Sequence, residues 1–155
     1  MRRLLLVITH IAAVAVGFAL GVYTLPILTA DHGPDKTALE QAASAAQFTA
    51  TFDRKLKGSD FFHWGEGSIH VMPDKIAHVG RLSPGPDYKL YLTPEFVDDE
   101  VSFLKLKDKA ARIGDVKSFD GFLLAVPSGV DVASYNTVVV WCEAFGEFIS
   151  AAKYR

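Results

Sequence analysis

The sequence predicts an all-β domain, a sandwich or barrel of short antiparallel strands, preceded by a single transmembrane helix. Three observations support this fold class. A long apolar stretch occupies residues 4–28, short runs of alternating apolar and polar residues recur after residue 48, and Gly, Pro and Asp separate these runs. Short strands bounded by such turn residues are typical of sandwiches and barrels.

Size and composition limit the classes of protein to be considered. The chain has 155 residues, half of them hydrophobic, which leaves room for one domain and an appendage and argues against disorder. The net charge is −2 and no long Lys/Arg run occurs, so nucleic acid is not an expected partner. A single cysteine excludes an internal disulfide framework and a four-cysteine zinc site.

The N-terminal stretch predicts a membrane anchor over residues 1–30. Its apolar part, residues 4–28, contains no Asp, Glu, Lys or Arg, and about 20 such residues cross a bilayer core. Arg2 and Arg3 precede it and Asp31 follows it. The positive-inside rule therefore predicts a cytoplasmic N-terminus, with the rest of the chain outside the cytoplasm; in a bacterium that compartment is the periplasm.

A cleaved signal peptide is the alternative for this segment. The apolar region of a signal peptide usually has about 7–15 residues and ends at a small-x-small cleavage site. Here the run is longer, and the nearest candidate site, Leu28-Thr29-Ala30, has a large residue at its first position. These features favour an uncleaved anchor, and both interpretations place the following residues in the same compartment.

A linker is expected over residues 31–47 and a β domain over residues 48–155. The linker contains the turn signal Gly33-Pro34 and an Ala-rich piece that suits a short helix or a flexible stalk. The domain is long enough to bury about two-thirds of its chain surface and so to form one core.

The β domain shows six segments with strand-like patterns. Residues 97–117 are less regular and are compatible with a turn of helix before Gly114, whereas residues 145–154 fit either a strand or a helical turn. The expected strands occupy residues 49–56, 67–71, 75–82, 87–92, 121–126 and 135–142.

Cys142 ends the strongest of these strands, YNTVVVWC. Strand alternation places it on the same face as Val138 and Val140. One interpretation is a buried small hydrophobe, which free cysteine often is. The other is a redox thiol or cofactor ligand, because an unpaired thiol outside the cytoplasm is unusual. No Lys, Arg or His lies within four residues, so a reactive thiolate would need cations brought in by the fold.

Three histidines and a methionine are further candidate ligands. The spacing of His63, His70 and His78 places them on neighbouring β segments, and Met72 could join them as a soft ligand. No CxxC, HExxH or CxxCH motif is present, so no dedicated metal site is predicted. A haem held by Cys, His or Met stays open, because axial ligands need no local motif.

Three segments together suggest a family. HWGEGSIHV at 63–71, GPDYKLYL at 85–92 and YNTVVVWCEAF at 135–145 resemble, in order and spacing, the DM-thirteen domain. This small extracytoplasmic module is described as an electron-transfer domain and is related to the DOMON β-sandwich domains, which bind haem or sugar. The resemblance covers residues 48–155. It implies that Cys142 is the signature cysteine, acting as a bare thiol or holding a prosthetic group.

Two functions follow from these observations. The first is a membrane-anchored redox module centred on Cys142, with His63, His70, His78 or Met72 as further ligands and a membrane or redox protein as partner. The alternative is a non-catalytic module that docks to an envelope or membrane protein complex, with Cys142 structural. A classical turnover enzyme is not expected, since no GxSxG, P-loop or nucleophile–base set is present.

Overall fold

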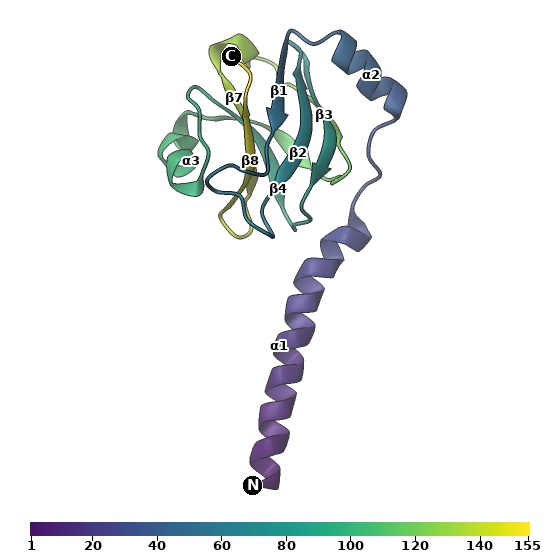
Figure 1. Ribbon diagram of the computed structural model, residues 1–155, viewed down its shortest axis with the longest axis vertical. Helices are drawn as coiled ribbons and strands as arrows, with labels where there is room; N and C mark the ends of the chain where they lie inside the picture. Colours follow the sequence, from purple (N-terminus) through teal and green to yellow (C-terminus); the bar gives the residue numbers. More distant parts are fainter.

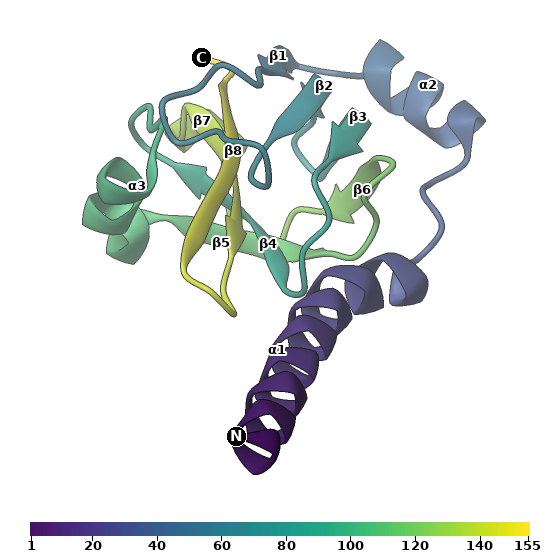
Figure 2. The ribbon, with the colours of Figure 1, turned by 60° about the horizontal axis from the view of Figure 1, so that its bottom comes forward.

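Helix α1 (Arg2–Thr29) extends away from the rest of the molecule, and two β-sheets pack face to face beyond its C-terminal end (Figure 1). This computed structural model describes residues 1–155. Both sheets are antiparallel and have four strands, which confirms the predicted β-sandwich preceded by a helix. Figure 2 shows the two sheets from the end that faces α1.

Helix α1 is long and apolar enough to cross a membrane, a test that an N-terminal signal sequence also passes. Its 28 residues extend about 42 Å at 1.5 Å per residue, against a hydrocarbon core of about 30 Å. Pro26 is its only buried residue, so most of its apolar side chains are exposed. The hydroxyls of Thr9, Thr24 and Thr29 donate to carbonyls of the preceding turn and therefore need no water.

The segment after α1 lies against the β domain. The backbone N–H of Asp31 donates to the carbonyl of Lys117 at 3.0 Å. The Ala-rich piece, expected to form a helix or a stalk, is helix α2 (Lys36–Ser44). Its Leu39 and Ala42 pack on Met72 and the β3 strand, so this segment is held by contacts with the sheet.

The strand order is β1-β2-β3-β6 in one sheet and β5-β4-β7-β8 in the other. The strands are β1 (Phe48–Phe52), β2 (Gly65–Val71), β3 (Lys75–Leu82), β4 (Tyr88–Thr93), β5 (Ala111–Val116), β6 (Phe122–Ala125), β7 (Thr137–Cys142) and β8 (Glu147–Lys153). The open alternative for the C-terminal segment is thus resolved as a strand, because β8 pairs with β7 along its length.

The irregular region at 97–117 contains both a helix and an unexpected strand. Helix α3 (Glu100–Leu106) begins with an Asp99 capping box and continues into a 3-10 turn at Lys107–Lys109. Strand β5 follows and pairs with β4. The sequence does not predict this strand, because Gly114 interrupts the apolar pattern and only Ile113 and Val116 are buried in the core.

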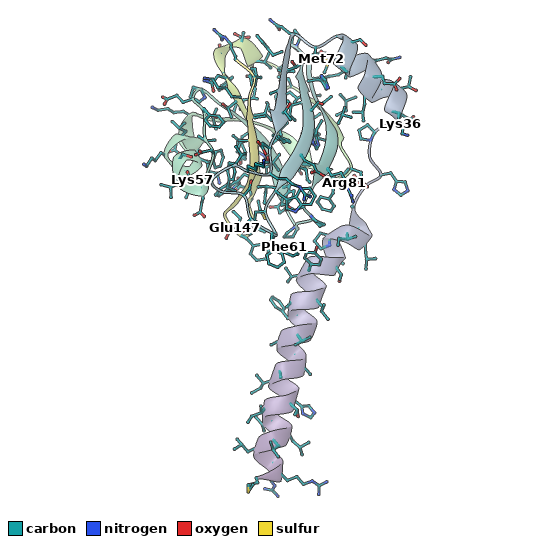
Figure 3. All side chains as sticks on the ribbon, viewed as in Figure 1. Lys36, Lys57, Phe61, Met72, Arg81 and Glu147 are labelled. Atoms are coloured by element: carbon teal, nitrogen blue, oxygen red, sulfur yellow. The ribbon has the colours of Figure 1, made fainter.

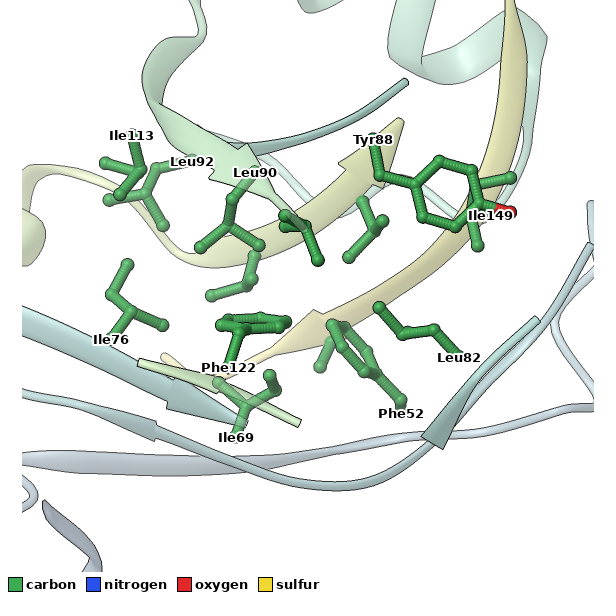
Figure 4. Packing of buried hydrophobic residues seen from close by; sticks show 14 of the residues in the cluster. Phe52, Ile69, Ile76, Leu82, Tyr88, Leu90, Leu92, Ile113, Phe122 and Ile149 are labelled. Atoms are coloured by element: carbon green, nitrogen blue, oxygen red, sulfur yellow. The ribbon is translucent and has the colours of Figure 1, made fainter. Parts of the chain in front are cut away.

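The two faces of β7 enter different cores, as alternation predicts. Val138, Val140 and Cys142 join the cluster between the two sheets, part of which Figure 4 shows. Val139 and Trp141 point the other way and pack under α3. All six residues of β7 are buried, and each fully buried valine contributes about 1.5–3 kcal/mol. The strand is therefore fixed from both sides.

A close approach of β2 to β3 positions the buried His78. Gly67 has φ +112°, a conformation that favours glycine, and it pairs with Gly80. A Cβ at Gly80 would overlap the carbonyl oxygen of Glu66 and lie 2.8 Å from Nε2 of His78. Without that Cβ, Nε2 of His78 donates to the Glu66 carbonyl at 2.9 Å.

His78 makes the stability of the fold depend on pH. Its ring lies between those of Phe52 and Phe122 with centroids 5.1 Å from each, and its Nδ1 has no partner. Burial lowers the pKa of His78 from 6.5 to about 4, so the folded chain holds the neutral ring. Below pH 6.5 the unfolded chain takes up a proton that the folded chain does not, and stability falls as pH falls towards 4.

We predict that the free energy of unfolding decreases by about 2 kcal/mol between pH 7.5 and pH 5.0, at 1.36 kcal/mol per pH unit below 6.5. Denaturant titration of the full-length protein in detergent at the two pH values measures it. His78→Gln, which cannot titrate, should lose most of this difference. Part of the pH dependence should remain in this variant, since burial lowers the pKa of His70 as well. Equal stability of the wild type at both pH values would contradict the assignment.

Candidate functional site

A cavity of about 420 Å³ lies where α1 approaches the end of the sandwich, and Cys142 lines it. Phe18, Ala19, Val22 and Tyr23 of α1 form one wall. Figure 3 shows Phe61 and Glu147 at this end of the domain, beside α1; Glu147 is a lining residue. The other lining residues from the β domain are Phe62, His63, Pro84, Gly85, Pro86, Tyr88, Phe145 and Ile149.

Strand pairing places Cys142 beside Tyr88. The two residues face each other at the ends of β7 and β4, and both side chains belong to the core between the sheets. Only 2% of Cys142 and 3% of Tyr88 is exposed. The turn after β7 is closed by a hydrogen bond from the N–H of Gly146 to the carbonyl of Cys142, which returns the chain along the cavity.

The electrostatics of the cavity favour a protonated thiol. Burial raises the pKa of Cys142 above its ordinary value, and the carboxylate of Asp87 acts in the same direction. Nearby backbone hydrogen bonds oppose this only in part. No lysine or arginine lines the cavity, so the fold does not bring the cations that a reactive thiolate would need. At neutral pH this group is a thiol and a poor nucleophile.

His63 is the histidine that shares the cavity with Cys142. Its Nδ1 lies 3.0 Å from Oδ2 of Asp60, whose Oδ1 accepts the backbone N–H groups of Phe62 and His63 at 2.7 Å. Although burial acts in the opposite direction, the hydrogen bonds from His63 and Phe62 lower the pKa of Asp60. Holding Nδ1 by a carboxylate leaves Nε2 free, the arrangement that orients many metal-binding histidines.

The other candidate ligands do not line this cavity. His78 lies in the core of the sandwich, and His70 lies on the other face of the first sheet, opposite Ala77. Met72 packs against α2 and lies far from Phe61 and Glu147 in Figure 3. Of the five candidates, the structure therefore brings together Cys142 and His63 alone. No three His, Cys, Asp or Glu side chains converge in a group suited to a metal ion.

The donors in the cavity suit a cofactor held by one or two protein ligands. A cysteine thiolate and an imidazole with a free Nε2 are both axial ligands of haem in proteins, so Cys142 would have to lose its proton to bind the iron, whereas His63 would not. The volume of about 420 Å³ falls in the range of small-molecule sites, roughly 300–1,000 Å³, and the lining is mostly apolar as in such sites. Cys142 and His63 are thus the residues that would hold a prosthetic group here.

Two parts of the cavity were missed by the sequence analysis. Tyr88 was not among the candidate residues, although it is a buried core residue that also lines the cavity; its place at the start of a strand, directly after the Pro84-Gly85-Pro86 turn, could have indicated this. No residue pattern in the sequence predicts that α1 forms a wall of the cavity, because its position depends on the path of the chain between the helix and the β domain.

Comparison with known proteins gives one match. A family model described as Electron transfer DM13 matches residues 51–154, about two-thirds of the chain and all but the first strand residues of the β domain. Neither the curated proteins nor the solved structures contain a match.

We predict that Cys142 in the folded protein reacts with iodoacetamide at pH 8 roughly tenfold or more slowly than free cysteine, because the thiolate is scarce and the sulfur is buried. Intact-protein mass spectrometry of the full-length chain in detergent follows the single alkylation. Unfolding in urea should restore the ordinary rate, which serves as the internal control. A folded protein that reacts as fast as free cysteine would contradict the buried, protonated thiol.

Proposed function

Because the chain belongs to the DM13 electron-transfer family, we propose that it is a membrane-anchored, extracytoplasmic electron-transfer module with Cys142 as its redox centre. One observation carries the proposal: the only cysteine of the chain lines an apolar cavity that α1 closes on one side. An apolar lining lowers the local dielectric constant, which strengthens electrostatic interactions and tunes the potential of a redox group.

In this proposal α1 remains attached and crosses the membrane with its N-terminus in the cytoplasm. Arg2 and Arg3 before the helix and Asp31 after it support that direction. The position of α1 supports retention as well. Cleavage after the helix would remove Phe18, Ala19, Val22 and Tyr23, and with them one wall of the cavity.

The residues of the chain have distinct parts in this role. The thiol of Cys142 is either the redox group itself or a ligand, and His63, oriented by Asp60, is the second ligand or base. A bound haem would supply one-electron chemistry at its iron. The apolar lining excludes water, and the buried hydroxyl of Tyr88, whose pKa burial raises, remains a hydrogen-bond donor at neutral pH.

A non-catalytic docking module is the second candidate. The observation that favours it is that Cys142 packs with Val138 and Val140 as an ordinary core residue, with a raised pKa and no cation in the cavity. The exposed rings of Phe61 and Phe145 would then contact a partner in the membrane or envelope.

A redox titration of the full-length protein, purified in mild detergent and followed by its UV–visible spectrum, separates the two candidates. We predict a redox transition that Cys142→Ser abolishes or shifts. Ser150→Ala, which changes a buried hydroxyl that does not line the cavity, is the matched control and should leave the transition unchanged.

The spectrum also assigns the ligand. A Soret band that is lost in Cys142→Ser identifies the thiol as an axial ligand, and one that is lost only in His63→Ala identifies the imidazole. Indistinguishable titrations of wild type and Cys142→Ser would contradict the redox role of the thiol and favour the docking module.

A further inference from the structure

We propose that the Cys142 cavity binds the ring of a lipid-soluble quinone that enters from the bilayer. The inference rests on the form of the proposed function in which the Cys142 thiol is itself the redox group, because a haem bound to Cys142 would occupy the same cavity. It concerns binding alone: the ring lies against the thiol, and no bond forms or breaks.

The α1 wall of the cavity lies close to the end of a membrane span. About 20 residues cross the hydrocarbon core, so a span that begins near Leu4 ends close to Tyr23, which is a lining residue. The chain has little freedom beyond this point. Two residues after the end of α1 at Thr29, Asp31 is hydrogen-bonded to Lys117 in the β domain. This tether holds the domain next to the point at which the helix leaves the bilayer.

Exposed aromatic side chains lie in and beside the cavity. Phe61 is 85% exposed, more than any other large hydrophobic residue of the β domain, and Phe62 and Phe145 are both 57% exposed. Phe62 and Phe145 line the cavity, and Phe62 packs edge-on against Tyr23 of α1 at 6.4 Å. Exposed rings at the end of a membrane span are suited to the lipid headgroup region, where they leave an apolar path into the cavity.

The lining suits a planar ring with two acceptor oxygens. Its surface is largely apolar, and the few polar groups include the Tyr88 hydroxyl and the His63 ring. The hydroxyl of Tyr88 has only a 3.5 Å contact with Oγ of Ser83, too long for a strong hydrogen bond. A quinone carbonyl would accept from such a buried donor, whereas a saturated lipid chain would leave it unsatisfied.

The redox-active groups of the chain also favour a quinone as the ligand. With one cysteine, the chain cannot form an internal disulfide. No group of three His, Cys, Asp or Glu side chains in the structure could hold a metal ion. A partner for electron exchange must therefore reach Cys142 from outside the chain. The cavity that contains the thiol opens beside a membrane helix, and quinones are the electron carriers that dissolve in the bilayer.

Binding can be measured with the full-length protein in lipid nanodiscs. The probe is a benzoquinone with a ten-carbon tail, detected by quenching of tryptophan fluorescence; Trp64 follows His63 in the loop beside the cavity. We predict saturable quenching. Ala19→Phe places a ring in the cavity from the α1 side and should weaken binding roughly tenfold, or about 1.4 kcal/mol, because the new ring occupies the space of the quinone.

Ala12→Phe is the matched control, because it lies seven residues earlier, two turns down the same side of α1, and does not line the cavity. It should bind the quinone as the wild type does. Equal quenching of the wild type and Ala19→Phe would overturn the inference. Displacement of the quinone by an equal concentration of decanol would also overturn it, since the site would then accept any alkyl chain.

The redox titration distinguishes this inference from the proposed function. Absence of saturable binding, with a transition that still depends on Cys142, overturns the quinone site and leaves the redox role of the thiol in place. Saturable binding that Ala19→Phe weakens, with a titration unchanged in Cys142→Ser, supports the quinone site and contradicts the thiol's role.

Discussion

The pairing of β4 with β7 is the constraint on which the rest of the structure depends. These strands pair without a break from Tyr88 opposite Cys142 to Thr93 opposite Thr137, in the middle of the second sheet. The inner face of β7 packs against the first sheet, and its outer face, which carries Val139 and Trp141, packs against Phe103 of α3. A thiol on such a strand cannot move to meet a partner, so its chemistry depends on what reaches the cavity.

The same burial that fixes the thiol also limits its reactions. Burial raises the pKa of Cys142, and no cation lines the cavity, so the site is unsuited to thiolate chemistry such as disulfide exchange. Its mostly apolar lining suits the binding of a largely apolar ring. The helix contributes to this site as well as to anchorage, because residues of α1 form one wall.

The sequence was most informative where one residue pattern determines one structure. In β7 strand alternation predicted correctly which side chains share a face with Cys142, and in β3 the predicted range of 75–82 is the observed one. Strand β5 was missed because Gly114 and two charged residues weaken its pattern, so that pairing with β4 decides its conformation. The strand propensity of residues 111–116 alone could not predict a strand that forms because it pairs with β4.

The candidate site was harder to predict than the fold. Sequence spacing placed His63, His70 and His78 on neighbouring segments, but it could not tell which of them lies near Cys142, since that depends on strand order and on the Asp60 turn. Cys142 itself was identified by strand pattern and by family resemblance, and the family match at 51–154 confirms the resemblance. Its role as redox centre is the central claim of the account.

Magnetic resonance on the oxidised protein tests that claim most directly. Because the chain has one cysteine, growth on β-deuterated cysteine labels Cys142 alone. Electron–nuclear double resonance of the paramagnetic state of the full-length protein then reports whether the unpaired spin reaches this side chain. The account predicts deuterium couplings from the Cβ of Cys142, whether the thiol is the radical site or an axial ligand. A paramagnetic centre without such couplings would contradict it.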